Sequence, residues 1–221
     1  MKEEISKNQN SKLFAPALVI IAASLWAVDG IVLRPSLYNL PVPLVVLIES
    51  LIVAILLTPF FIKKISSLNN LMTKDWLAFF GVALLGGAIG TMSITKALFY
   101  VNFVNLSVVI LLQKLQPIFA ISLATIFLKE KLPKEFFLWA GLAIVGAYIM
   151  TFGLSSPNFS TGDKTTIAAL FALLAAFSFS SSTVLSKRAL RNVDYETGTY
   201  LRFLFSSIIM MIIASTTGDI S

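Results

Sequence analysis

The sequence contains no cysteine and no histidine, and only 13% of its 221 residues are charged. Without a thiolate or an imidazole, the chain cannot build the usual zinc sites, a cysteine nucleophile or a serine–histidine–aspartate triad. A soluble domain carries roughly 25% charged residues, about twice the fraction found in this chain. These absences argue against an ordinary soluble domain, and we expect no metal, no cofactor and no enzymatic activity.

Hydrophobic residues, in contrast, make up 57% of the sequence, and the mean hydropathy is +0.88. A helix that crosses the hydrocarbon core of a bilayer needs about 20 mostly apolar residues. The seven stretches that meet this requirement are Leu13–Leu33, Val42–Ile62, Trp76–Leu98, Leu106–Leu128, Glu135–Phe152, Thr165–Leu185 and Thr197–Ala214. The sequence therefore predicts an all-α integral membrane protein, with residues 1–12 as a solvated tail.

Positive charge is distributed unequally between the two sides of these spans. Twelve basic residues fall in the tail and in the second, fourth and sixth loops, namely Lys2, Lys7, Lys12, Lys63, Lys64, Lys74, Lys129, Lys131, Lys134, Lys187, Arg188 and Arg191. The opposite loops hold only Arg34 and Lys164. Because basic loops remain cytoplasmic, we expect a multi-pass protein of the plasma or inner membrane with a cytoplasmic N-terminus. The basic residues then face lipid headgroups, so no nucleic-acid partner is needed.

The sequence aligns with itself at one offset. Residues 23–51 align without a gap with residues 176–204, an offset of 153. The aligned pairs include Trp26 with Phe179, Arg34 with Lys187, Asn39 with Asn192, and Glu49 with Arg202. A repeat of five spans is odd in number, so its second copy must enter the membrane upside down. Inverted repeats of this kind are typical of secondary transporters.

The same offset predicts the organisation of the chain. We expect residues 13–153 to form a first five-helix repeat, residues 154–164 an external linker, and residues 165–221 the start of an inverted second repeat. Two complete copies would need about 306 residues and ten helices. About seven helices are present, which we interpret as a truncated form.

Several short motifs resemble the drug/metabolite transporter superfamily, EamA type. They are Ala97, Leu98 and Tyr100 at the entry to the fourth span, Gln116–Pro117 within it, Glu130–Lys131–Leu132 after it, Trp26 in the first span and Arg202 in the seventh. The resemblance implies a ten-helix transporter of small metabolites, often an exporter. Glu49 departs from the pattern because the family often carries arginine at that position, and this leaves the charge of the substrate open.

Ionisable residues inside the predicted spans are candidates for a substrate or ion pathway, because each costs about 2.5–3.5 kcal/mol to insert. Five such residues are Asp29, Glu49, Lys96, Lys114 and Arg202. Glu49 and Lys114 both lie roughly 10–12 Å below the outer boundary, at 1.5 Å of rise per residue. Our hypothesis is that they line a central polar cavity, and the alternative is a buried structural ion pair.

The remaining candidates have less certain roles. Gln113 and Gln116 share one helix face and are expected to help line the cavity. The heads of Asp29 and Lys96 either belong to the pathway or reach to water at the interface. Arg202 either reaches inward to water or binds an anionic substrate group.

Two patterns concern architecture. Pro117 removes a backbone hydrogen bond in the middle of the fourth span, which permits either a static kink or a moving element. Small residues recur in the third and sixth spans at Gly81, Gly86, Gly87, Gly90, Ala168, Ala172 and Ala176. Such residues allow helices to approach closely in membranes.

Together these features predict a permease that moves amino-acid-like or drug-like solutes, with efflux as the expected direction, by alternating access. Glu49 is the candidate for proton coupling, because burial raises the pKa of a carboxylate while Lys114 would lower it. The competing interpretation is a non-transporting fragment, or a subunit that borrows helices from a partner such as a second copy. An intramembrane enzyme is disfavoured, since Asp29 and Glu49 are, apart from Glu135 at the very start of the fifth span, the only acids in the spans and lie at different depths.

Overall fold

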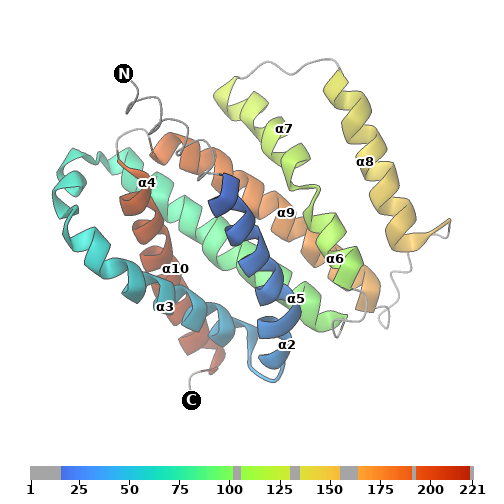
Figure 1. Ribbon diagram of the computed structural model, residues 1–221, viewed down its shortest axis with the longest axis horizontal. Coiled ribbons are helices and arrows are strands. Elements are labelled where there is room, and N and C mark those ends of the chain that lie inside the picture. Colours follow the sequence, from blue (N-terminus) through green and yellow to red (C-terminus); the bar gives the residue numbers. More distant parts are fainter. Residues whose placement is uncertain (1–15, 102–105, 130–134, 155–163, 191–192, 220–221) are drawn as a thin grey trace, which may run out of the picture. The chain divides into compact units, whose positions relative to one another are not determined.

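The computed structural model describes residues 16–101, 106–129, 135–154, 164–190 and 193–219, and these residues form helices and turns without any strand (Figure 1). The six helices that are long and apolar enough to cross a membrane are Pro16–Ser36, Val42–Ile62, Thr73–Tyr100, Val108–Phe127, Lys164–Ala189 and Tyr195–Thr217. A seventh, shorter apolar segment covers Glu135–Gly146. The prediction of an all-α membrane protein is confirmed. The predicted tail 1–12, the motif Glu130–Lys131–Leu132, Asn192 and most of the predicted linker 154–164 lie outside the described residues.

The chain divides into two compact units, residues 1–39 and residues 40–221. The first unit consists of the helix Pro16–Ser36, which ends in a π turn, η1 (Asp29–Leu33), and a short turn, α2 (Arg34–Ser36). Arg34 Nε donates to Asp29 Oδ2 at 2.7 Å, so the two charges neutralise each other within the same helix. The helix ends at Ser36, three residues beyond the predicted end at Leu33.

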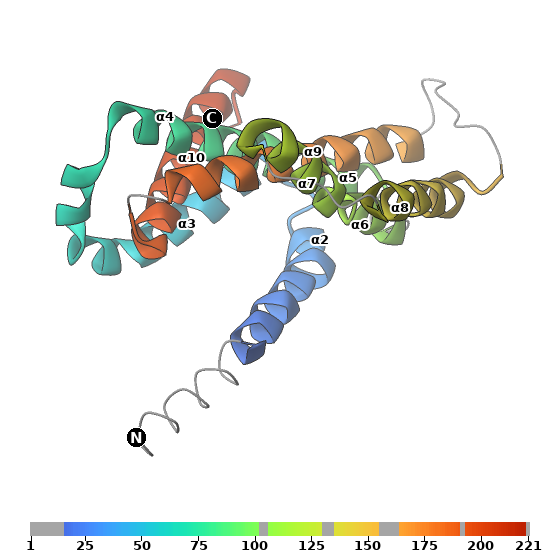
Figure 2. The ribbon, with the colours of Figure 1, turned by 90° about the horizontal axis from the view of Figure 1, so that it is seen from above.

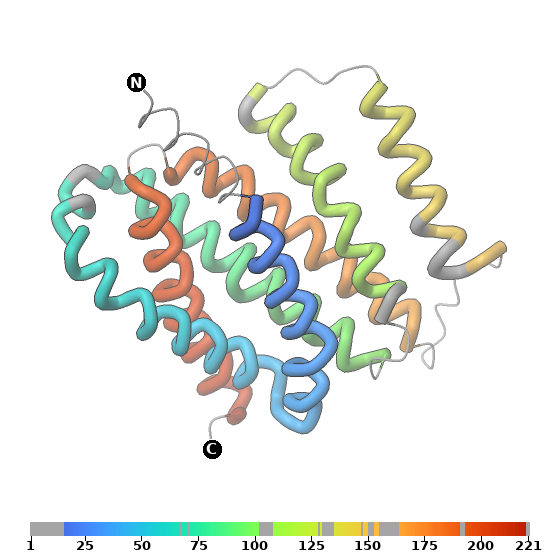
Figure 3. Tube along the Cα trace, viewed as in Figure 1, coloured from blue at the N-terminus to red at the C-terminus, as the bar shows by residue number. Residues whose placement is uncertain are grey.

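The second unit contains all the other elements. These are α3 (Val42–Ile62), the 3₁₀ turn η2 (Ile65–Asn70), α4 (Thr73–Val82), the π segment η3 (Ala83–Gly90), α5 (Thr91–Tyr100), α6 (Leu106–Gln113), α7 (Gln116–Leu128), α8 (Glu135–Phe152), α9 (Lys164–Ala189) and α10 (Tyr195–Thr217). Helix α3 has the predicted bounds, and α4, η3 and α5 follow one another without a break as the third span (Figure 3). The π segment in the middle of that span was not predicted.

Helix α9 is the central element of this unit and packs against α4, η3, α5, α6 and α7 (Figures 1 and 2). One face of α9 carries Ala168, Ala172 and Ala176, which are fully buried. Their spacing of four residues places the small side chains in one row, so neighbouring helices can approach closely. The predicted packing role of these alanines is confirmed.

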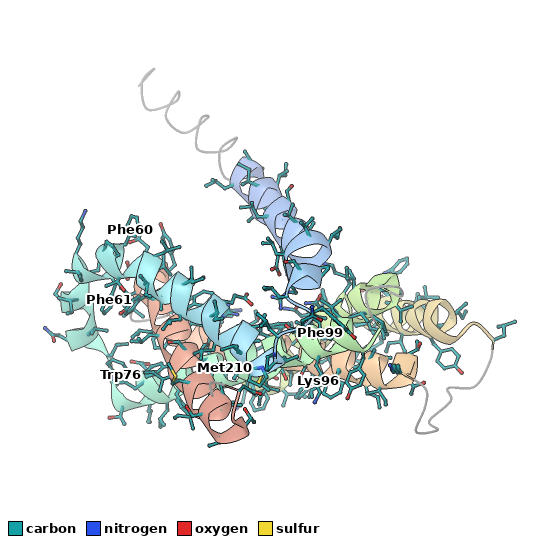
Figure 4. The ribbon with its side chains drawn as sticks, turned by 90° about the horizontal axis from the view of Figure 1, so that it is seen from below. Phe60, Phe61, Trp76, Lys96, Phe99 and Met210 are labelled. Atoms are coloured by element: carbon teal, nitrogen blue, oxygen red, sulfur yellow. The ribbon has the colours of Figure 1, made fainter. Side chains whose placement is uncertain are left out.

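Helix α10 packs along α3 in the opposite direction. At one end the rings of Phe61 and Tyr200 stack with their centroids 4.0 Å apart. At the other end Val46 on α3 and Met210 on α10 belong to one buried apolar cluster, and Figure 4 labels Phe61 and Met210 at these separate places. Beyond the stacked rings, Lys64 Nζ lies 2.5 Å from both Asp194 Oδ2 and Glu196 Oε2. We call these three charged residues the Lys64 cluster.

Helix boundaries recur at the interval found in the sequence. The helix Pro16–Ser36 ends 153 residues before the end of α9 at Ala189, and α3 begins at Val42, 153 residues before α10 begins at Tyr195. The helix ends and helix starts of the two aligned segments therefore fall at matching positions. Because α3 and α10 occupy equivalent places in the alignment and run antiparallel, their packing has the geometry that an inverted repeat requires.

The fourth span is broken. Helix α6 ends at Gln113, and α7 begins at Gln116 after a turn at Lys114 and Leu115. Pro117 lies in the first turn of α7, where its missing N–H leaves no hydrogen bond unmade. The predicted break at Pro117 is present. Helix α8 packs beside α6, on the side away from α9 (Figure 1).

Candidate functional site

The polar residues of the second unit gather where η3 crosses α9 and α10. Gly86 and Gly87 face Ser182 on α9 and Ser206 on α10. A Cβ atom on Gly86 would lie 2.3 Å from Ser182 Oγ, and a Cβ atom on Gly87 would lie 1.7 Å from Ser206 Oγ. No side chain fits at either glycine. We call these four residues the glycine–serine crossing.

Hydroxyl groups in and beside this crossing satisfy backbone carbonyls in and next to the π segment. Ser182 Oγ donates to the carbonyl oxygen of Val82 at 3.1 Å. Ser206 Oγ donates mainly to the carbonyl oxygen of Arg202 in its own helix at 2.7 Å, with that of Ala83 as a second, longer acceptor at 3.4 Å. Within the third span, Thr91 Oγ1 donates to the carbonyl oxygen of Gly86 at 3.0 Å. In a bilayer these carbonyls have no water to bond, so the hydroxyls stabilise backbone that departs from α geometry.

Arg202 lies beside the crossing on α10. A Cβ atom on Gly86 would lie 3.6 Å from Arg202 Nη2, and the guanidinium carbon lies 5.4 Å from the centroid of the Phe203 ring. The carboxylate of Glu49 on α3 is close enough to act on Arg202 electrostatically. Arg202 Nε is buried and has no hydrogen-bond partner among the described residues. The crossing therefore holds a cation with an unused donor.

The break in the fourth span lies on another side of α9. Ser180 Oγ lies 2.7 Å from the carbonyl oxygens of both Gln116, at the start of α7, and Ala176 of its own helix, so its one hydroxyl proton is shared between them. Gln113 is buried, with 6% of its surface exposed, and its Nε2 has no partner among the described residues. In the described part of the chain, the two buried side-chain atoms without a hydrogen bond are thus both donors, Gln113 Nε2 and Arg202 Nε.

The other predicted residues are distributed more widely. Asp29 belongs to the first unit, where Arg34 neutralises it. Glu49 on α3 and Lys114 in the α6–α7 turn both have exposed side chains, and the role predicted for them stays a prediction. Lys96 on α5 lies over the ring of Phe171, a residue of α9 (Figure 4 labels Lys96).

The serines were not among the predicted site residues. Ser180, Ser182 and Ser206 are each at most 5% exposed and contact backbone carbonyls of other helices. A signal was present for Ser180 and Ser182, because residues 178–183 are all hydroxyl-bearing except Phe179 and lie inside an apolar helix. Among the described residues there is no group of three acidic side chains that could hold a metal ion.

The comparison with known proteins adds a family. The model of the EamA-like transporter family matches residues 13–152 and 166–221. The chain is 48% identical over 201 residues to a Fusobacterium nucleatum protein named riboflavin transporter ImpX, and the match covers 90% of this chain and 67% of that protein. It is 27% identical over 157 residues to an uncharacterized transporter of Synechocystis, with 68% of this chain and 43% of that protein covered. The chain thus spans two thirds of one relative's length and under half of the other's. No solved structure matches.

Proposed function

Because the chain belongs to the EamA-like transporter family, we propose that it forms part of a permease for small organic solutes, and that these include riboflavin or a similar drug-like heterocycle. The observation that carries this proposal is the buried donor Arg202 Nε beside the glycine–serine crossing, which has no acceptor among the described residues; a second such donor, Gln113 Nε2, lies at the break in the fourth span. An unsatisfied buried donor costs about 1–3 kcal/mol, and a solute with carbonyl oxygens would relieve that cost. Flavin rings and amino-acid-like solutes both carry such oxygens.

The mechanism that we propose is alternating access between two inverted repeats, residues 13–153 and the segment that starts at residue 165. Two facts support it: the helix boundaries recur after 153 residues, and α3 packs antiparallel to α10. The glycine–serine crossing lies between the two repeats, since η3 belongs to the first and α9 and α10 to the second. A solute at that level would be reached from either face as the repeats rock.

We further propose that the protein lies in the plasma or inner membrane with its N-terminus in the cytoplasm. The support is the excess of lysine and arginine in alternate loops. Because the sequence has no cysteine, single cysteines placed at Lys64 and Lys164 would be the only thiols in the protein. A membrane-impermeant maleimide added to intact cells should label the cysteine at position 164 and spare the one at position 64. The reverse pattern would refute this topology.

Glu49 is our candidate for proton coupling. It is an acid within a predicted span, and it interacts electrostatically with Arg202. Replacing Glu49 by glutamine keeps the shape and removes the titrating group. We expect Glu49→Gln to abolish the dependence of flux on a pH gradient while the protein still inserts, and an unchanged dependence would rule out this role.

The function itself is tested by flux. The purified chain is reconstituted in liposomes, and the movement of radiolabelled riboflavin is measured in both directions against protein-free liposomes. We expect saturable flux that falls in Arg202→Lys, which keeps the charge but removes Nε–H, and persists in the control Lys63→Gln. Crosslinking of single-cysteine variants in the same liposomes would show whether the active form is a homodimer. If riboflavin and a panel of amino acids all move at the protein-free rate, the proposal fails for this chain.

A further inference from the structure

A separate cavity of about 200 Å³ lies between the third span, α9 and α10. Its wall is mostly apolar and includes Ala88 and Met92 of the third span, Phe171 of α9 and Ile213 of α10. Two polar residues interrupt this wall, Ser93 and Lys96. Ala88 belongs to η3, so the same π segment borders both this cavity and the glycine–serine crossing.

Lys96 is the residue that gives the cavity a chemical preference. Its Nζ lies 5.1 Å from the centroid of the Phe171 ring. Among the described residues, no acidic side chain forms an ion pair with Lys96. An ammonium within a span therefore rests on an aromatic face, which stabilises it by about 0.5–2 kcal/mol and leaves its N–H donors available to a ligand.

From this arrangement we infer that the cavity is a binding subsite for the aromatic end of a solute that carries a carboxylate or another electron-rich oxygen at its edge. The Lys96 ammonium binds that oxygen, Ser93 supplies a further hydroxyl, and Phe171 and Met92 contact the ring. This inference rests on the proposed function, because it assigns a chemical class to a solute of the permease.

The size of the cavity fits one part of a solute. A volume of 200 Å³ equals about six to seven water molecules at roughly 30 Å³ each. Pockets that enclose a whole drug-sized ligand are larger, about 300–1,000 Å³. The subsite therefore accommodates a small fused ring and its acidic edge, while the rest of the solute extends along η3.

The test measures binding rather than transport. The chain is reconstituted in phosphatidylcholine nanodiscs, and equilibrium dialysis gives the affinities for 2-naphthoate and for its neutral analogue 2-naphthalenemethanol, with empty nanodiscs as the blank. We expect the wild-type chain to prefer naphthoate. Lys96→Met should weaken naphthoate binding about tenfold or more, the loss expected for a hydrogen bond to a charged group, and leave the alcohol unchanged.

Three further variants test whether the charge of Lys96 and the ring of Phe171 are responsible for the binding of naphthoate. Lys96→Arg keeps the charge and should retain the preference for naphthoate. Phe171→Leu removes the ring and should weaken both compounds. Lys63→Met makes the same substitution as Lys96→Met, at an exposed lysine just beyond α3, and should change neither affinity.

Two results would overturn the subsite. One is a Lys96→Met chain that binds naphthoate as tightly as wild type, as expected if the ammonium only reaches out to water. The other is loss of binding of both naphthoate and the neutral alcohol when phosphatidylglycerol is added to the nanodiscs, which would identify a lipid as the occupant. Riboflavin flux on the same preparations separates the two proposals. If riboflavin flux is seen but naphthoate binding does not depend on Lys96, the subsite is wrong and the transport proposal stands. If naphthoate binding depends on Lys96 but no riboflavin flux is seen, the transport proposal is wrong and the subsite stands.

Discussion

The glycine–serine crossing and the Lys64 cluster both hold α10 against its neighbours. The crossing is so closely packed that it has no room for an added atom, whereas the side chains of the Lys64 cluster are partly exposed. At the crossing, Gly87 allows Ser206 to touch the backbone of η3. In the Lys64 cluster, the side chains of Lys64 and Glu196 are each 38% exposed, and they lie outside the predicted spans. Inside a bilayer, lipid is as apolar as leucine, so close packing must supply the stability. Outside the bilayer, exposed ion pairs contribute less to the stability of the fold, and their contribution changes with salt and pH.

The largest expected loss of stability comes from a substitution that disrupts the glycine–serine crossing. Gly87→Ala places a Cβ atom 1.7 Å from Ser206 Oγ and 2.6 Å from Ser206 Cβ, so α10 must move away. Overpacking of this kind costs about 1–3 kcal/mol. We expect a clear drop in the melting temperature of the purified protein in detergent, followed by its helical circular dichroism.

Two companion variants test whether the loss of stability comes from overlap between the added Cβ atom and Ser206. The double variant Gly87→Ala/Ser206→Gly should recover most of the loss, because the Ser206 Cα atom is already at an ordinary distance of 3.6 Å. Gly141→Ala on α8 adds the same methyl group where nothing lies within 4 Å. Equal losses in Gly87→Ala and Gly141→Ala would contradict the steric account.

A smaller effect tests the hydroxyl at the same place. Ser182→Ala removes the hydrogen bond to the carbonyl oxygen of Val82 without adding bulk. Hydrogen bonds between membrane helices contribute about 0.6 kcal/mol on average, so we expect a modest fall in melting temperature. The matched control is Ser181→Ala, whose hydroxyl donates within its own helix to Phe177. A larger loss in the control would show that the inter-helix bond is not the cause.

The smallest effect concerns the Lys64 cluster and depends on pH. The hydrogen bond from Lys64, and then the one from Thr197, lower the pKa of Asp194, whereas Asp194 and then Glu196 raise the pKa of Lys64. The acid thus stabilises the fold above its unfolded pKa of about 3.9, and this contribution is lost as pH falls through the lower folded value. The contribution of Lys64 is complete below its unfolded pKa of about 10.4 and is lost only as pH rises through a still higher folded value.

We therefore expect melting temperatures that are level between about pH 5 and 9 and fall in acid, with a smaller acid effect in Lys64→Gln. High salt should narrow the difference between that variant and wild type, because salt screens exposed charges. Lys63→Gln, at the neighbouring exposed lysine, is the control. A wild-type protein whose stability is the same at pH 3 and pH 7 would show that the cluster does not contribute.

Much of the fold could be predicted because hydropathy and helix length are local properties. The bounds of α3 agree with the predicted span, and the alanines of α9 occupy the predicted packing face. The break beside Pro117 could also be anticipated, since proline lacks a backbone donor. The π segment was missed, because the hydroxyls that contact carbonyls in and next to it come from α9 and α10, which lie 100 or more residues away in the sequence.

The candidate site was predicted less completely. Arg202 and Gln113 were selected as polar residues inside spans, and the structure gives each a buried donor without an acceptor among the described residues. Glu49 and Lys114 share a predicted depth, yet both side chains are exposed. Depth follows from position in the chain, whereas burial depends on which helix covers a given face.

By itself, the sequence determined that this protein is an all-helical membrane protein with basic residues concentrated in alternate loops, because the cost of burying charge in a bilayer acts on each segment separately. Only the tertiary structure decided which small residues meet, where Gly87 touches Ser206, and that Lys96 rests on Phe171 beside a cavity. Those relations join helices that are distant in sequence. They depend on how closely the helix backbones approach one another, which no single segment specifies.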